Sequence, residues 1–147
     1  MAGKLDRQED TVAAVAPGNL VHVVDRLSQR RFLCDTGSAY SLLPHQSSAA
    51  SCGPPLRGAG GQPIRCWGEQ ELTVQFGDRV FTWTFLKADI SFPILGIDFF
   101  SNFHLVVDGS SHSLVDIKTL LPVAAAPSAL QSSPSQHSVA TVIKEAH

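Results

Sequence analysis

An acid at the end of an apolar strand is the feature that most constrains this chain. The run Phe32-Leu33-Cys34 leads directly into Asp35, and Thr36-Gly37-Ser38 then interrupts it. A carboxylate at the end of a buried strand costs free energy unless its charge is used or paired. The stretch therefore predicts a strand that carries a functional acid into a tight loop.

Length and composition indicate one domain with tails. The chain has 147 residues, 44% of them hydrophobic, and its 11 glycines and 9 prolines favour many turns and an all-β structure. The net charge of -2 argues against a basic face for nucleic acid. No apolar run is long enough to span a membrane, and the first residues do not resemble a signal peptide.

The cysteines and histidines do not indicate a metal, a cofactor or a disulfide framework. Cys34, Cys52 and Cys66 are an odd number without CxxC spacing, which fits a reducing compartment. The six histidines form no metal-ligand motif. We therefore expect no cofactor, no metal, and a cytoplasmic location that includes virus-like particles.

Alternating apolar residues predict a β-rich middle. Strands are expected at 20–24, 32–34 and 42–44, with a polar hairpin turn at 25–30. Strands at 69–76 and 80–86 flank the turn Gly77-Asp78. The aromatic residues Phe81, Trp83 and Phe85 would suit either a platform for bases or a core, and the lack of a basic patch favours the core.

A glycine-rich stretch predicts a hairpin tip formed by Gly58, Ala59, Gly60 and Gly61. A disordered loop is one interpretation of it. The other is a mobile flap that covers a bound substrate. The preceding segment, 45–57, is rich in Ser, Ala and Pro and shows little regular structure.

The second half of the domain is expected to end in a helix and a hairpin. An apolar strand at 92–96 precedes a short helix at 97–103 that buries Phe99, Phe100 and Phe103. Strands at 105–107 and 114–117 form a closing hairpin. The predicted boundaries are a flexible leader at 1–18, one domain at 19–122, and a linker or tail toward a following polyprotein domain at 123–147.

Several of these motifs together resemble the retropepsins, the retroviral-type aspartic proteases, and especially the proteases of gypsy-class LTR retrotransposons. The resemblance covers about residues 20–120. The motifs that carry it are Phe32-Leu33-Cys34-Asp35-Thr36-Gly37-Ser38, Leu42-Leu43-Pro44, Phe81-Thr82-Trp83-Thr84-Phe85, Ala88-Asp89-Ile90, Pro93-Ile94-Leu95-Gly96-Ile97-Asp98-Phe99-Phe100 and Phe103-His104-Leu105-Val106-Val107-Asp108.

The resemblance implies a closed β-barrel, the acid protease fold, with one short C-terminal α-helix, forming half of a homodimer. It makes Asp35, Thr36 and Gly37 catalytic. Such chemistry needs two carboxylates that share a proton. Asp108 reads as part of a turn and Asp98 as a residue that caps or fixes the helix, so the second acid is expected to be Asp35 of another copy.

The resemblance also implies the substrate contacts. Ser38 would hydrogen-bond to the Asp35 carboxylate, and Ala39 and Tyr40 would contact the peptide, although packing is an equal interpretation for Tyr40. Ile94 would shape an apolar pocket, and the tip 58–61 would cover an extended peptide by β pairing. The departure from the family is at this tip, where an Asn-Gly pair is common and Gly-Ala-Gly-Gly stands here.

Three functions fit this sequence. The first is an endopeptidase that processes its own Gag-Pol-type polyprotein. The second is a host-domesticated domain that cleaves a cellular protein. The third is a non-catalytic dimerisation or binding module with the same fold, which the intact Asp-Thr-Gly-Ser disfavours.

Overall fold

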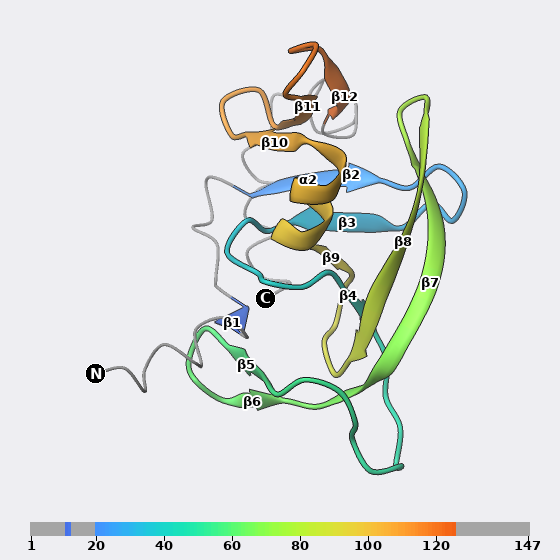
Figure 1. Ribbon diagram of the computed structural model, residues 1–147, viewed down its shortest axis with the longest axis vertical. Helices are drawn as coiled ribbons and strands as arrows, with labels where there is room; N and C mark the ends of the chain where they lie inside the picture. The colour runs from blue at the N-terminus through green and yellow to red at the C-terminus, as the bar shows by residue number, and fades with distance from the viewer. Residues whose placement is uncertain (1–10, 13–19, 126–147) are drawn as a thin grey trace, which may run out of the picture.

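The computed structural model describes residues 11–12 and 20–125 (Figure 1). These residues form strands and one short helix, which confirms the predicted all-β class with a short helix. The elements are β1 (Thr11–Val12), β2 (Val21–Val24), β3 (Arg31–Cys34), β4 (Leu42–Pro44), β5 (Leu56–Gly58), β6 (Pro63–Ile64), β7 (Cys66–Phe76), β8 (Arg79–Ala88), β9 (Ile94–Leu95), α2 (Ile97–Phe103), β10 (Leu105–Asp108), β11 (Ser113–Asp116) and β12 (Pro122–Ala125).

The central sheet of the described residues has the strand order β2-β3-β9-β4-β8-β7. Its longest pair is the hairpin β7–β8, in which buried Val74 lies opposite Phe81. The two-residue strand β9 lies between β3 and β4, parallel to β3 and antiparallel to β4. Ile94 is therefore the register partner of both Leu33 and Leu42. Strands far apart in sequence meet at this point.

Two apolar clusters lie on opposite faces of the strands that meet at β9. The first cluster contains Cys34 and Leu95 and most of the buried aromatic side chains. The second cluster contains Leu33 and Ile94. Successive residues of a strand point to opposite faces, so β3 and β9 each contribute to both clusters.

The helix α2 completes the first cluster through its aromatic side chains. Phe99 is fully buried, and its ring centroid lies 5.2 Å from that of Phe81 and 4.8 Å from that of Phe103. Phe99 and Phe100 are buried as expected, whereas Phe103 is half-buried. Burial of each large aromatic side chain contributes about 1.5–3 kcal/mol, which fixes α2 against β8.

The two edges of the central sheet are joined at one end by Asp25. Its carboxylate accepts hydrogen bonds from Gln75 N at 2.7 Å on β7 and from Ser28 Oγ at 2.6 Å in its own turn. Arg26 N also donates to Gln75 O at 2.8 Å. These bonds join the 25–30 turn, which follows β2, to the opposite edge strand β7.

Several segments differ from the sequence-based expectation. The segment 45–57 packs on β7. Trp67 Nε1 donates to Ala49 O at 3.0 Å, and the backbone of Cys52 forms an isolated parallel β-bridge with Trp67. The strand expected at 92–96 is formed only by β9. Within the predicted leader, β1 pairs in parallel with β5, and β12 continues the β10–β11 sheet three residues into the predicted tail. The remaining leader and tail residues lie outside the described residues.

The described part of the chain contains no helix with the length and apolar character needed to cross a membrane.

Removal of the Asp25 carboxylate is predicted to destabilise the fold. Asp25→Ala leaves buried donors without an acceptor, and we expect the free energy of unfolding to fall by about 3 kcal/mol. Urea unfolding at pH 7 measures this. The matched control is Asp78→Ala at the neighbouring turn, where the carboxylate is fully exposed and lies 3.6 Å from Arg26. A loss no larger in Asp25→Ala than in the control would contradict the prediction.

Candidate functional site

The Asp35 loop, residues 35–41, connects β3 to β4 beside β9. Asp35 N donates to Leu95 O at 2.9 Å, which continues the β3–β9 pairing by one residue. Gly37 N donates to Asp35 Oδ1 at 3.0 Å, and Ser38 N donates to Asp35 O at 3.0 Å. The acid is therefore held at the strand end by backbone groups on both sides.

The Asp35 carboxyl is a buried acid whose pKa is raised. The residue is 2% exposed. Burial raises its pKa from 3.8 to about 6, and the hydrogen bond from Gly37 N opposes this rise. No described Lys or Arg forms an ion pair with it. A carboxyl with a pKa near neutrality can both hold and release a proton at physiological pH.

The neighbouring Cys34 does not supply a nucleophile. Burial, followed by the adjacent Asp35 charge, raises the pKa of its thiol well above the ordinary value. Only the thiolate is strongly nucleophilic, so this side chain acts as a small apolar group of the first cluster.

The predicted catalytic residues split into one buried and two exposed positions. Asp35 is buried, while Thr36 and Gly37 are exposed. Ser38 is fully buried, and its Oγ donates to Tyr40 O at 2.7 Å. The expected bond from Ser38 to the Asp35 carboxylate is replaced by this one, because the Ser38 side chain points into the loop.

The other predicted substrate contacts lie partly inside the folded chain. Ala39 and Tyr40 are half-buried, and Tyr40 packs against the second cluster, the alternative already considered for it. Ile94 is 4% exposed and belongs to the same cluster. Within this chain Ile94 is therefore a core residue between β3 and β4.

The predicted glycine-rich tip is the turn of the β5–β6 hairpin. Gly58 N donates to Gln62 O at 2.8 Å, and Gly61 N donates to Gly58 O at 2.9 Å. Ala59, Gly60 and Gly61 are exposed, whereas Gly58 is buried beneath the Gln62 side chain. Of the tip residues only Gly61 adopts a positive φ, of 88°. Figure 1 shows this hairpin at the end of the molecule opposite β10–β12.

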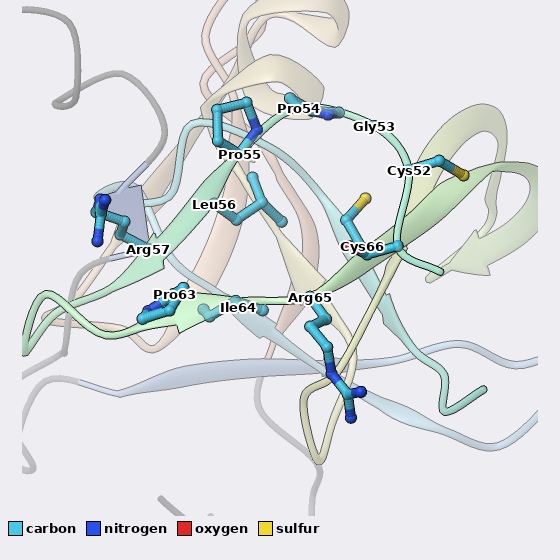
Figure 2. Close-up of a pocket in the computed structure, with 11 residues that line it drawn as sticks. Cys52, Gly53, Pro54, Pro55, Leu56, Arg57, Pro63, Ile64, Arg65 and Cys66 are labelled. Atoms are coloured by element: carbon cyan, nitrogen blue, oxygen red, sulfur yellow. The ribbon is translucent and has the colours of Figure 1, made fainter. Parts of the chain in front are cut away.

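A cavity of about 320 Å³ lies at the base of this hairpin (Figure 2). The residues that line it come from 51–57 and 63–66, and they include the exposed Cys52 and the buried Cys66. No residue of the Asp35 loop lines it. It lies between these two segments and does not belong to the candidate catalytic site.

Neither alternative acid in this sequence joins Asp35. The Asp108 carboxylate accepts a hydrogen bond from Ser110 Oγ at 2.7 Å in an exposed turn, which lowers its pKa. Asp98 is not the N-cap of α2, which is Gly96, but it fixes the first turn as expected, because it accepts from Phe99 N and from groups of β8 and the Asp35 loop. Among residues 11–12 and 20–125, no cluster of three or more His, Cys, Asp or Glu side chains could hold a metal ion.

Sequence reasoning missed the role of Ser41. This fully buried residue donates from Oγ to Asp98 Oδ1 at 2.8 Å and accepts from Gly96 N at 2.9 Å. A serine inside an apolar run gives a weak signal of such a role. Its neighbours in the sequence, Tyr40 and Leu42, could not indicate which backbone groups it would reach.

Comparisons with known proteins give likenesses among solved structures alone. No family model and no curated protein matches the chain. Among solved structures, EIAV protease complexed with the inhibitor HBY-793 aligns with 23% sequence identity and a TM-score of 0.43, over 56% of this chain and 85% of that chain. The assignment of a function therefore depends on the residues and geometry described above.

The buried Asp35 carboxylate is predicted to make stability depend on pH. Because its pKa is raised from 3.8 to about 6, the folded chain holds a proton that the unfolded chain releases. Stability therefore falls as pH rises through this window. Asp35→Asn, which keeps an acceptor for Gly37 N, should be more stable than wild type at pH 7.5 by about 1–2 kcal/mol, allowing for solvent screening at the loop.

Urea unfolding of dilute protein at pH 4 and pH 7.5 measures this difference, which should vanish at the lower pH. The control is Asp108→Asn, which should give no gain, since the pKa of Asp108 is lowered in the folded chain. Parallel pH dependences for wild type and Asp35→Asn would refute the prediction.

Proposed function

We propose that this chain is one protomer of a homodimeric aspartic endopeptidase of the retropepsin type. The observation that carries the proposal is the buried Asp35 carboxyl, with its pKa raised to about 6, on a loop whose next two residues are exposed. Backbone bonds at Leu95 and Gly37 hold the acid rigidly, as a catalytic group requires. The Asp-Thr-Gly-Ser sequence supports the same reaction class.

The reaction needs one ionised and one protonated carboxyl. The ionised Asp35 takes a proton from water as the water oxygen attacks the peptide carbonyl carbon. The protonated carboxyl gives its proton to the carbonyl oxygen, which forms a tetrahedral diol. Transfer of a proton to the amide nitrogen then breaks the C–N bond and yields a carboxylic acid and an amine. No acyl-enzyme forms at any step.

The second carboxyl comes from a second copy of the chain. No other acid in the described part of the protein lies in the Asp35 loop, and exposed Thr36 and Gly37 are available for contact across a two-fold axis. Two like charges brought together cannot both ionise, so dimerisation would raise one of the two pKa values further. The pair would then hold one shared proton up to a higher pH than a single Asp35 does.

The substrate is an extended peptide. A peptide placed between the Asp35 loop and the exposed tip residues Ala59, Gly60 and Gly61 would pair with backbone groups of both. We propose a Gag-Pol-type polyprotein as the physiological substrate, on the resemblance to the gypsy-class proteases. A host-domesticated domain would share this chemistry and differ only in the protein that it cleaves.

The first test is cleavage by purified variants. Wild type should cut a precursor that carries the flanking polyprotein, faster at pH 5 than at pH 7, because high pH removes the shared proton. Asp35→Asn should lose at least about 10³-fold in rate, since it removes the acid and base together. Asp108→Asn should cut at the wild-type rate. A dimeric wild type that leaves the precursor uncut would favour the binding-module function.

The second test is mixing of subunits. If both carboxyls come from Asp35, a mixed dimer of wild type and Asp35→Asn has one acid and is inactive. With equal amounts and free exchange, activity should fall to about one quarter of that of the same total of wild type. A fall only to one half would show that each protomer works independently.

A further inference from the structure

Asp98 accepts hydrogen bonds from the end of the Asp35 loop, from β8 and from its own helix. Its carboxylate accepts from Ser41 N at 3.1 Å, from Ser41 Oγ at 2.8 Å and from Trp83 Nε1 at 3.1 Å. Phe99 N, in its own helix, donates to Oδ1 at 2.8 Å. Each carboxylate oxygen thus receives two donors. Asp98 therefore joins the first turn of α2 to the end of the loop and to β8.

The Ser41 hydroxyl links Asp98 to the backbone at Gly96, just before the helix. The Ser41 hydroxyl donates to Asp98 and accepts from Gly96 N at 2.9 Å. Ser41 O accepts from Leu86 N at 3.0 Å on β8. Because the hydroxyl of this fully buried serine has one partner as a donor and another as an acceptor, it has no freedom to turn.

Gly96 in turn lies directly against the Asp35 loop. A Cβ on Gly96 would lie 2.5 Å from Tyr40 O and 2.8 Å from Ser38 O. Ile97 N donates to Ser38 O at 2.9 Å. Immediately before Gly96, Leu95 O accepts from Asp35 N at 2.9 Å. The segment 95–97 therefore contacts both ends of Asp-Thr-Gly-Ser, and Ser41 fixes where that segment lies.

We propose that Asp98, acting through Ser41, is a positioning residue. It fixes where the Asp35 loop lies relative to residues 95–97. The expected effect of Asp98 on the reaction rate rests on the proposed protease function. Its effect on the loop itself does not depend on that function. Asp98 touches neither Asp35 nor the site of the substrate, so it is not a catalytic residue.

The arrangement needs a carboxylate and not an amide. All the described partners of Asp98 donate a proton. An Asn amide nitrogen at the Oδ2 position would face the N–H groups of Ser41 and Trp83. At the Oδ1 position it would face Phe99 N–H. In either orientation Asp98→Asn therefore takes the acceptor from two of these four donors, with almost no change in volume.

The test compares Asp98→Asn with Phe103→Leu in the full chain. Phe103 lies on the same helix and packs on Phe81, Phe99 and Trp83, so Phe103→Leu weakens the packing of the helix without removing a donor or an acceptor of these hydrogen bonds. Two readouts are measured in each variant under conditions where it is fully folded. They are the pKa of Asp35 with the Gly37 amide shift, by NMR titration, and kcat and KM for precursor cleavage.

For Asp98→Asn we expect a higher Asp35 pKa, because a displaced loop loses the Gly37 N–H bond that lowers it. We also expect kcat to fall by about tenfold or more with little change in KM, since misplacement of a reacting group acts on the chemical step. Phe103→Leu should leave both readouts at wild-type values. Ser41→Ala should reproduce Asp98→Asn, and the double variant should add nothing further.

An unchanged Asp35 titration and Gly37 shift in folded Asp98→Asn would overturn the proposal, whether or not the wild type cuts peptides. An equal effect of Phe103→Leu would also overturn it, because the cause would then be general loosening of the helix. Absence of cleavage by wild type, together with a shifted Asp35 titration in Asp98→Asn, would reject the protease function and leave the positioning role standing.

Discussion

The insertion of β9 between β3 and β4 is the constraint on which the candidate site depends. This strand consists of two residues, Ile94 and Leu95. It pairs in parallel with β3 and antiparallel with β4. The loop that joins β3 to β4 must therefore pass around the end of β9. Gly96 follows without a side chain, in extended backbone with φ of -104°, because the space beside it is filled by the carbonyls of Ser38 and Tyr40. Here glycine is required for close approach and not for a positive φ.

The position of Asp35 follows from the division of the core into two clusters. Leu33 and Ile94 face one cluster, and Cys34 and Leu95 face the other. Asp35 directly follows the last residue of β3, Cys34, and directly precedes the exposed residues Thr36 and Gly37. It is buried enough for its pKa to rise, yet the following residues are exposed. A carboxyl deep in either cluster could not exchange a proton with water, and one on the surface would keep its ordinary pKa.

The elements that could be predicted from the sequence are those fixed by local pattern. Alternating residues such as Leu72, Val74 and Phe76 indicated β7, and the apolar run into Asp35 indicated β3 and its loop. The hydrogen-bonded acids could not be predicted as such. Asp25 and Asp98 each take their partners from residues far along the chain, Gln75 and Ser41, and no local pattern specifies such pairs. The two-residue β9 depends on tertiary contacts for the same reason, and so do the pairing of β1 with β5 and the pairing of β12 with β11.

The late position of β9 in the sequence has a consequence for synthesis of the chain. The Asp35 loop emerges early from the ribosome, but the strand that supports it and the helix residue that orients Ser41 follow much later. Until residues 94–98 have been made, Asp35 has neither the Leu95 carbonyl to pair with nor a cluster in which to be buried. A nascent chain therefore carries the acid as an ordinary solvated carboxylate. The order of translation itself delays formation of the site until nearly the whole domain is present.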